Sequence, residues 1–229
     1  MTSVRIKSYF ARRASARLWG ALACVVLAAS AVLTRADDAS LIALAKHRYG
    51  AAAGALVQEW REFIVAQKGV PEAEALKRVN DFFNRRIRFA DDAEIWRQPD
   101  YWATPIEMMG KGAGDCEDYT IAKYFSLREL GVPAAKLRLI YVKARIGGPA
   151  SSITQAHMVL GYYETPDAQP LVLDSLIGEI RPAAQRPDLV PVFSFNGEGV
   201  YAGGVVSSVE RLSRWKDMQL KMKAEGYTP

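Results

Sequence analysis

The spacing of hydrophobic positions changes near Gly131, and this change divides the chain into a helical part and a strand-forming part. Before it, apolar side chains recur at helical intervals, which predicts helices over 38–48, 52–67, 71–87 and 116–130. After it, short apolar runs separated by turns rich in Gly, Pro and Asp predict strands over 136–143, 156–163, 170–174, 190–195 and 199–202. A polar helix is expected over 207–225. The fold class is therefore α+β, with N-terminal helices packed on an antiparallel sheet.

One internal segment, 90–114, lacks a clear hydrophobic period and contains several Pro and Gly residues. It is predicted to be a loop that leads directly to Cys116. Its large apolar residues, Trp102, Met108 and Met109, have two interpretations. They either pack beneath the loop as core or line a groove beside it.

The N-terminal segment differs from the rest of the chain. Basic residues precede an apolar run over 18–33, and small residues at 34–36 fit the requirement of a signal peptidase before Asp37. At 16 residues the run is shorter than the roughly 20 of a membrane-spanning helix. We expect residues 1–36 to be a signal peptide and 37–229 to form a single domain in the periplasm, with an uncleaved anchor as the alternative.

The basic charge of the chain belongs to this leader. The whole sequence has 30 Lys and Arg against 25 Asp and Glu. Without the six basic residues of the leader, 24 remain against 25 acidic ones. Nucleic-acid binding, which needs a basic surface, is therefore not expected.

A single cysteine, Cys116, remains once the leader is removed. No internal disulfide is then available, and a thiol at the start of a helix is favoured as the thiolate by unpaired N–H groups and the helix dipole. His157 opens an apolar strand, where an imidazole needs a partner, and Asp174 ends another, where a buried carboxylate needs a donor. The order nucleophile, base, orienter supports acyl transfer through a thioester, with Cys116, His157 and Asp174 as a catalytic triad. The other histidine, His47, is interpreted as a solvated or capping residue.

Three carboxylates, Asp115, Glu117 and Asp118, surround the cysteine in sequence. One interpretation is that Asp115 caps the helix while the other two stabilise its first turn. The second is that they bind a hard cation such as Ca²⁺, which takes several oxygen ligands. Spacing alone leaves both interpretations open.

Five motifs together resemble the bacterial transglutaminase-like cysteine proteinases, and within them the LapG-type periplasmic proteases. They are WATP at 102–105, GDCEDY at 114–119, HMVL at 157–160, VLD at 172–174 and VPVFSFN at 190–196. The resemblance implies a papain/transglutaminase-like fold and a triad of Cys116, His157 and Asp174. It also implies calcium dependence, with Asp115 and Glu117 as ligands, Asp118 as a weaker third, and Asp91, Asp92 and Asp100 as further candidates.

The same resemblance implies a substrate and a partner. The substrate is the N-terminal region of a large surface adhesin, cut beside a pair of small residues, which releases the adhesin and disperses biofilm. The partner is the periplasmic domain of an inner-membrane cyclic di-GMP receptor that sequesters the protease. Two alternatives keep the triad, a transglutaminase-like acyltransferase and a cell-wall peptide hydrolase, because all share the thioester step. A non-catalytic binding module is a third alternative.

Overall fold

The computed structural model describes residues 38–147, 151–209 and 212–227. The expected signal peptide therefore lies outside the described residues. Two units are distinguished, residues 1–40 and 41–229, and the labelled elements below belong to the second. Among the helices of the described ranges, none combines the length and the apolar character needed to cross a membrane.

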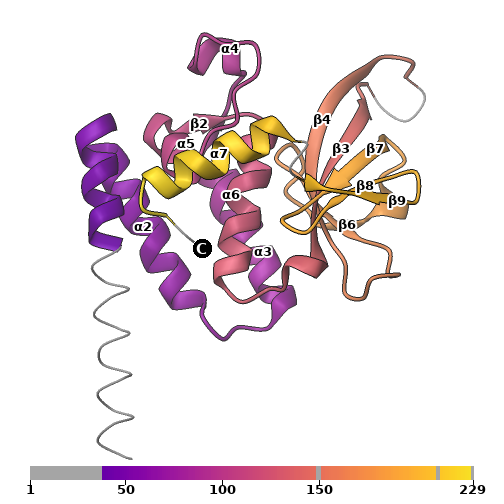
Figure 1. Ribbon diagram of the computed structural model, residues 1–229, viewed down its shortest axis with the longest axis horizontal. Coiled ribbons are helices and arrows are strands. Elements are labelled where there is room, and N and C mark those ends of the chain that lie inside the picture. Colours follow the sequence, from indigo (N-terminus) through magenta and orange to yellow (C-terminus); the bar gives the residue numbers. More distant parts are fainter. Residues whose placement is uncertain (1–37, 148–150, 210–211, 228–229) are drawn as a thin grey trace, which may run out of the picture. The chain divides into compact units, whose positions relative to one another are not determined.

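The second unit is mixed α and β, as the sequence predicts (Figure 1). Residues 38–49 are helical, as predicted for 38–48. The helices that follow, including two short 3-10 helices, are α2 (Ala51–Gln67), α3 (Glu72–Arg86), α4 (Asp92–Ile95), α5 (Pro105–Lys111), α6 (Cys116–Glu129), η1 (Ala134–Lys136), η2 (Ala183–Gln185) and α7 (Ser213–Ala224). Its strands are β1 (Arg88–Phe89), β2 (Ala113–Gly114), β3 (Leu137–Arg145), β4 (Thr154–Tyr162), β5 (Leu171–Leu173), β6 (Arg181–Pro182), β7 (Leu189–Phe195), β8 (Val200–Ala202) and β9 (Val205–Ser207).

Seven of these strands form one antiparallel sheet in the order β6-β5-β4-β3-β7-β8-β9. The hairpin β3–β4 lies at its centre and pairs Val142 with His157. Only the last three residues of β4 pair with β5, so the half of β4 that contains His157 has no strand partner on that side among the described residues. This free edge faces the start of α6, which packs against β4 and β3.

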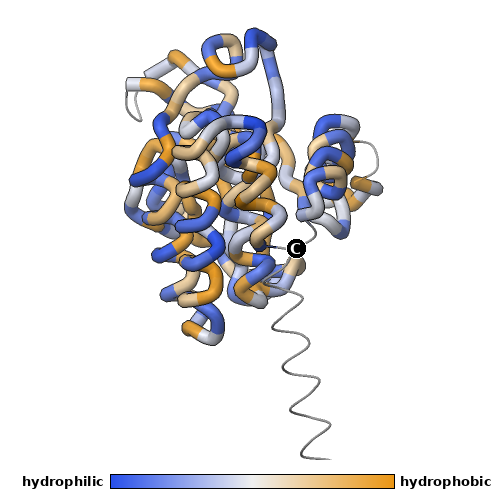
Figure 2. Tube along the Cα trace, turned by 90° about the vertical axis from the view of Figure 1, so that its left-hand side faces the viewer, coloured by the Kyte–Doolittle hydropathy of each residue, from blue (hydrophilic) through white to orange (hydrophobic). Residues whose placement is uncertain are grey.

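The main core lies between the helices and one face of the sheet. Hydrophobic residues recur along each helix (Figure 2), and those turned inward are fully buried, as for Trp60, Phe83 and Leu127. Phe195 of β7 is equally buried on the sheet side. The indole N–H of Trp60 donates to the Ser126 hydroxyl at 2.9 Å, which joins α2 to α6. A smaller apolar cluster, which includes Val142, Val159 and Val172, covers the opposite face of the sheet.

The segment 90–114 is more ordered than predicted, because it contains α4 and α5. Helix α5 begins with Thr104 and Glu107 in a capping box and Pro105 in its first turn. Met108 and Met109 are 0% and 1% exposed, which confirms for these two residues the interpretation that they pack beneath the segment as core. The terminal helix is shorter than predicted, since 205–207 form strand β9 and α7 begins at Ser213.

Candidate active site and calcium site

Cys116 is the first residue of α6 and is partly buried. The N–H groups in the first turn of a helix have no partner within the helix, and the dipole is positive there. Asp115 stands at the N-cap, but its side chain makes no capping hydrogen bond, so the capping interpretation is wrong for this residue. The start of the helix therefore presents a thiol next to a carboxylate that does not cap the helix.

Gly114 allows this turn to pack closely against α6. A Cβ atom at this position would lie 2.9 Å from the Cβ of Asp118 and 3.0 Å from its Oδ2. Asp118 is 1% exposed, and its Oδ1 accepts a 2.7 Å hydrogen bond from the N–H of Ala103. A glycine is thus needed for the buried carboxylate of Asp118 to reach the loop before α5.

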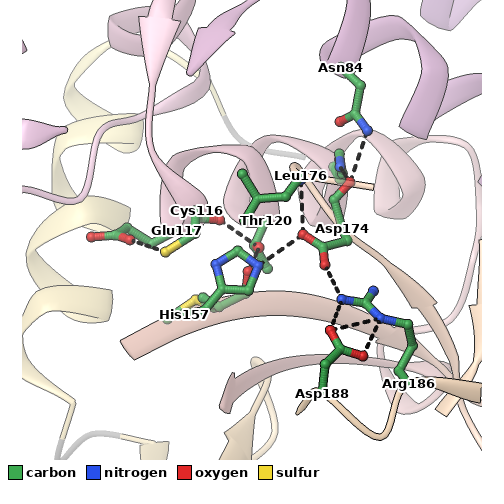
Figure 3. A network of polar contacts seen from close by, with 11 residues as sticks. Asn84, Cys116, Glu117, Thr120, His157, Asp174, Leu176, Arg186 and Asp188 are labelled. Carbon is green, nitrogen blue, oxygen red and sulfur yellow. Dashed lines mark hydrogen bonds and ion pairs between the residues drawn. The ribbon is translucent and has the colours of Figure 1, made fainter. Parts of the chain in front are cut away.

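His157 and Asp174, predicted from separate strands, lie in direct contact. The Nε2 of His157 is 2.9 Å from Oδ1 of Asp174, and the two residues are 5% and 1% exposed (Figure 3). By strand alternation they share the sheet face of Val159 and Val172. The contact leaves Nδ1 as the free ring nitrogen, and Figure 3 shows it turned toward the side on which the sulfur of Cys116 lies.

The thiol of Cys116 lines the same cavity as His157. Its Sγ donates to Oε2 of Glu117 at 3.0 Å, and the N–H of Met158, from the free edge of β4, donates to the sulfur. Burial raises the pKa of this thiol, and the negative charges of Glu117 and Asp115 raise it further. In this arrangement the thiol is therefore protonated.

The carboxylate of Asp174 has more partners than the imidazole. Its Oδ1 also accepts from the N–H of Leu176 at 3.0 Å, and its Oδ2 accepts from Nη2 of Arg186 at 2.8 Å. Burial would raise the pKa of Asp174, but the hydrogen bond and charge of His157, with the other two donors, lower it to about 2. The carboxylate is therefore ionised throughout the neutral range.

Two further side chains hold the main chain of Asp174. Its carbonyl oxygen accepts from Asn84 at 2.9 Å and from Nζ of Lys123 at 3.0 Å. Burial lowers the pKa of Lys123 to about 7, and the charge of Asp174 partly offsets this.

Sequence reasoning missed Asn84, Lys123 and Arg186. Asn84 and Lys123 lie within helical patterns, and Arg186 lies in a turn. None of the three belongs to a motif that would have singled it out.

A cluster of carboxylates lies beside the thiol. Oxygens of Asp92, Asp115 and Asp118 lie within 4.8 Å of one another, and so do those of Asp92, Asp100 and Glu117. One buried oxygen each of Asp92, Asp115 and Asp118 has no hydrogen-bond partner. Burial raises the pKa of all three, and the charges of neighbouring carboxylates add to the effect.

These residues fit a hard cation, which prefers several carboxylate oxygens. Asp115, Glu117 and Asp118 were predicted for this role and lie in these groups. Asp92, one of the further candidates, belongs to two of the groups, whereas Asp91 belongs to none of those found among the described residues.

The cavity beside Cys116 and His157 has a volume of about 680 Å³. Its lining includes Trp102, Tyr141 and Phe193, with Ala144 and Ala156 among the small residues. Trp102 stacks on Phe195 at 5.8 Å between ring centroids, so it belongs to the cavity wall as well as to the core margin. A cavity of this size that is open to solvent and next to a thiol suits an extended polypeptide segment.

A thiol at a helix start, next to a strand-borne imidazole bonded to a carboxylate, is the arrangement of a papain- or transglutaminase-like enzyme. The family model for bacterial transglutaminase-like cysteine proteinases matches residues 57–187, and the chain belongs to this family. No curated protein matches the chain.

Solved structures of LapG from Legionella pneumophila are similar to this chain. The EGTA-treated form is 36% identical, with a TM-score of 0.71 over 81% of this chain and 97% of that one. The calcium-bound form is also 36% identical, with a TM-score of 0.69 over 81% of this chain and 98% of that one. The fold is that of a transglutaminase-like cysteine protease.

Proposed function

We propose that this protein is a calcium-dependent cysteine endopeptidase of the LapG type. Cys116 is the nucleophile, His157 the acid and base, and Asp174 the residue that orients the imidazole. The observation that carries the proposal is the 2.9 Å contact between His157 and Asp174, beside a cavity that Cys116 also lines. Membership of a cysteine proteinase family supports it.

Acylation begins when the proton of the Cys116 thiol passes to Nδ1 of His157. The sulfur forms a bond to the carbonyl carbon of the scissile peptide, and the carbonyl oxygen takes the negative charge. The N–H of Cys116, at the helix start, is the donor we assign to this oxygen. His157 then gives its proton to the leaving amine as the C–N bond breaks, which leaves a thioester.

Deacylation uses the same imidazole. His157 takes a proton from water, the hydroxide attacks the thioester, and the thiol regains the proton as the acid product leaves. Asp174 stays ionised through both steps, because its pKa is lowered to about 2 by its partners. It therefore stabilises the imidazolium without taking its proton.

The acidic cluster completes the proposal. Asp92, Asp115, Glu117 and Asp118 would hold a calcium ion, and the bound ion would supply positive charge that neutralises the carboxylates around the thiol. The unpartnered oxygens of three of these residues support this assignment. The calcium-bound and EGTA-treated forms of LapG support it as well.

The substrate we propose is the N-terminal region of a large surface adhesin, cut beside an Ala-Ala type pair, with release of the adhesin and dispersal of biofilm. The cavity of about 680 Å³ beside the thiol, which Ala144 and Ala156 also line, supports a polypeptide substrate. The motif resemblance to LapG-type proteases and the 36% identity to LapG support this substrate class.

The proposed compartment is the periplasm, reached through the signal peptide at 1–36. There the periplasmic domain of an inner-membrane cyclic di-GMP receptor would sequester the enzyme. The motifs of the sequence, rather than a surface of the fold, support this regulation.

The proposal is tested by incubating the purified protein with an N-terminal adhesin fragment that contains the small-residue pair, in calcium and in EGTA. New protein termini found by mass spectrometry in calcium alone are the expected result. Cys116→Ala and His157→Ala should abolish cleavage, whereas the matched variant His47→Ala, at an exposed position, should retain it. A cross-linked product would indicate an acyltransferase, and cleavage by Cys116→Ala would contradict the proposal.

A further inference from the structure

Behind the His157–Asp174 pair lies a buried guanidinium that the catalytic steps above do not use. The side chain of Arg186 is 4% exposed and that of Asp174 is 0% exposed, and the two are joined at 2.8 Å. Asp188 holds the same guanidinium through Nε at 3.0 Å and Nη2 at 2.8 Å (Figure 3). Arg186 therefore stands between two carboxylates, with its fork geometry fixed from both sides.

The two oxygens of the Asp174 carboxylate have different partners. Arg186 occupies Oδ2, while Oδ1 is shared by His157 and the N–H of Leu176. A carboxylate with only one oxygen bound can rotate about its Cβ–Cγ bond, and the imidazole would then lose its fixed orientation. The guanidinium prevents this rotation.

The charge of Arg186 also helps to keep Asp174 ionised. Burial would raise the pKa of Asp174, but its donors, His157 first and Arg186 among them, lower it to about 2. A carboxylate in this state only accepts hydrogen bonds, so Nε2 of His157 is held as the donor at 2.9 Å and Nδ1 is left free.

We propose that Arg186 is a positioning residue of the site, which fixes the Asp174 carboxylate toward His157. Only its expected effect on kcat rests on the proposed function. The orientation of the imidazole exists in the resting protein and can be measured without a substrate.

The test is NMR of the imidazole N–H signals of the resting protein, with calcium in the buffer. The Nε2–H of His157, held on Asp174, should be protected from exchange with water, and exposed His47 serves as the unprotected reference. Arg186→Gln should speed the exchange of this proton about tenfold, and Arg186→Lys, which keeps the charge, should restore part of the protection. The matched control is Arg181→Gln, at a partly exposed arginine paired with Glu179, which should leave the exchange unchanged.

In the active enzyme, Arg186→Gln should lower kcat about tenfold with little change in KM, because the altered group does not touch the substrate. A folded Arg186→Gln variant in which the Nε2–H of His157 exchanges as slowly as in the parent would overturn the proposal, whatever its melting temperature. If that variant does not fold, Asp188→Asn replaces it. This change removes one of the two carboxylates that hold the guanidinium, so exchange should again be faster than in the parent, and unchanged protection would equally overturn the proposal.

Discussion

The carboxylate of Asp92 should make the calcium-free protein less stable as the pH rises. Asp92 is 3% exposed, and one of its oxygens has no partner. Burial raises its pKa from 3.8 to about 6, although the N–H of Tyr101 opposes the shift, and the charges of Glu117 and Asp100 add to it. Because the folded-state pKa lies above the unfolded one, the unfolded chain loses its proton first, and stability is lost as the pH rises from about 4 to about 6.

The size of the effect follows from the shift. A change from 3.8 to about 6 corresponds to at most about 3 kcal/mol. Relaxation of the site and water penetration in EGTA reduce this to about 1–2 kcal/mol. For a domain of this length the melting temperature should then fall by about 2–8 °C over this pH range in EGTA. Saturating calcium should offset the loss, since a ligand at a hundred times its Kd contributes about 2.7 kcal/mol.

The assay is thermal unfolding followed by circular dichroism from pH 4.5 to 7.5, in EGTA and in calcium. Asp92→Asn should flatten the pH dependence in EGTA and weaken calcium binding measured by calorimetry. Asp91→Asn is the matched control, because Asp91 is exposed and its side chain makes no capping bond to α4. A melting temperature of the parent protein that is independent of pH in EGTA would refute the reasoning, as would an Asp92→Asn variant that responds to calcium like the parent.

Two further substitutions test the rest of the site. In Asp174→Asn, the amide N–H₂ must face another donor in either orientation, because His157 and Arg186 both donate to this group. We expect the free energy of unfolding to fall by about 3–5 kcal/mol, measured by denaturant unfolding. We expect kcat to fall by about 10³–10⁴, measured by steady-state kinetics. Gly114→Ala places a Cβ 2.9 Å from the Cβ of Asp118, so calorimetry should show weaker calcium binding and unfolding a loss of about 1–3 kcal/mol.

Both substitutions have a matched control on the same chain. Asp167→Asn changes an exposed carboxylate in the turn between β4 and β5 and should leave stability and kcat unchanged. Gly178→Ala adds a methyl group where nothing lies within 4 Å. Wild-type kinetics in Asp174→Asn would exclude that residue from the site, and full calcium affinity in Gly114→Ala would exclude the packing argument.

The sequence was sufficient for the elements that have a long hydrophobic period. Helices α2, α3 and α6 and strands β3, β4 and β7 were predicted to within a few residues. Each of them places regularly spaced apolar side chains in the main core, and this spacing is visible in the sequence. Helix α5 was missed, although the Thr104–Glu107 capping box is visible in the sequence, because seven residues are too few for a period. Strand β9 is an edge strand of the sheet that pairs only with β8, and both Val205 and Val206 are exposed, so no burial pattern marked it.

The residues of the candidate site could be singled out where chemistry makes a residue type unusual, and their roles stay a proposal. A lone thiol at a helix start and polar residues within apolar strands indicated Cys116, His157 and Asp174 from the sequence. Arg186 was not predictable, because an arginine in a turn is usually solvated, and only the fold shows its 2.8 Å contact with a buried carboxylate. The place of Asp92 in the acidic cluster likewise depends on α4 folding back toward α6 across more than 20 residues of sequence, about the span from Asp92 to Asp115.

The acidic residues around Cys116 stabilise the helix but disfavour ionisation of the thiol. Carboxylates in the first turn of α6 stabilise the helix by about 0.3–1 kcal/mol each, through its dipole. The same charges, together with burial, raise the pKa of the thiol that must ionise. The helix dipole alone is too weak to reverse this, because three carboxylates of the cluster are themselves forced toward protonation by their mutual repulsion and burial. A cation at the unpartnered oxygens would offset these negative charges beside the thiol, which is the physical reason for the calcium dependence proposed above.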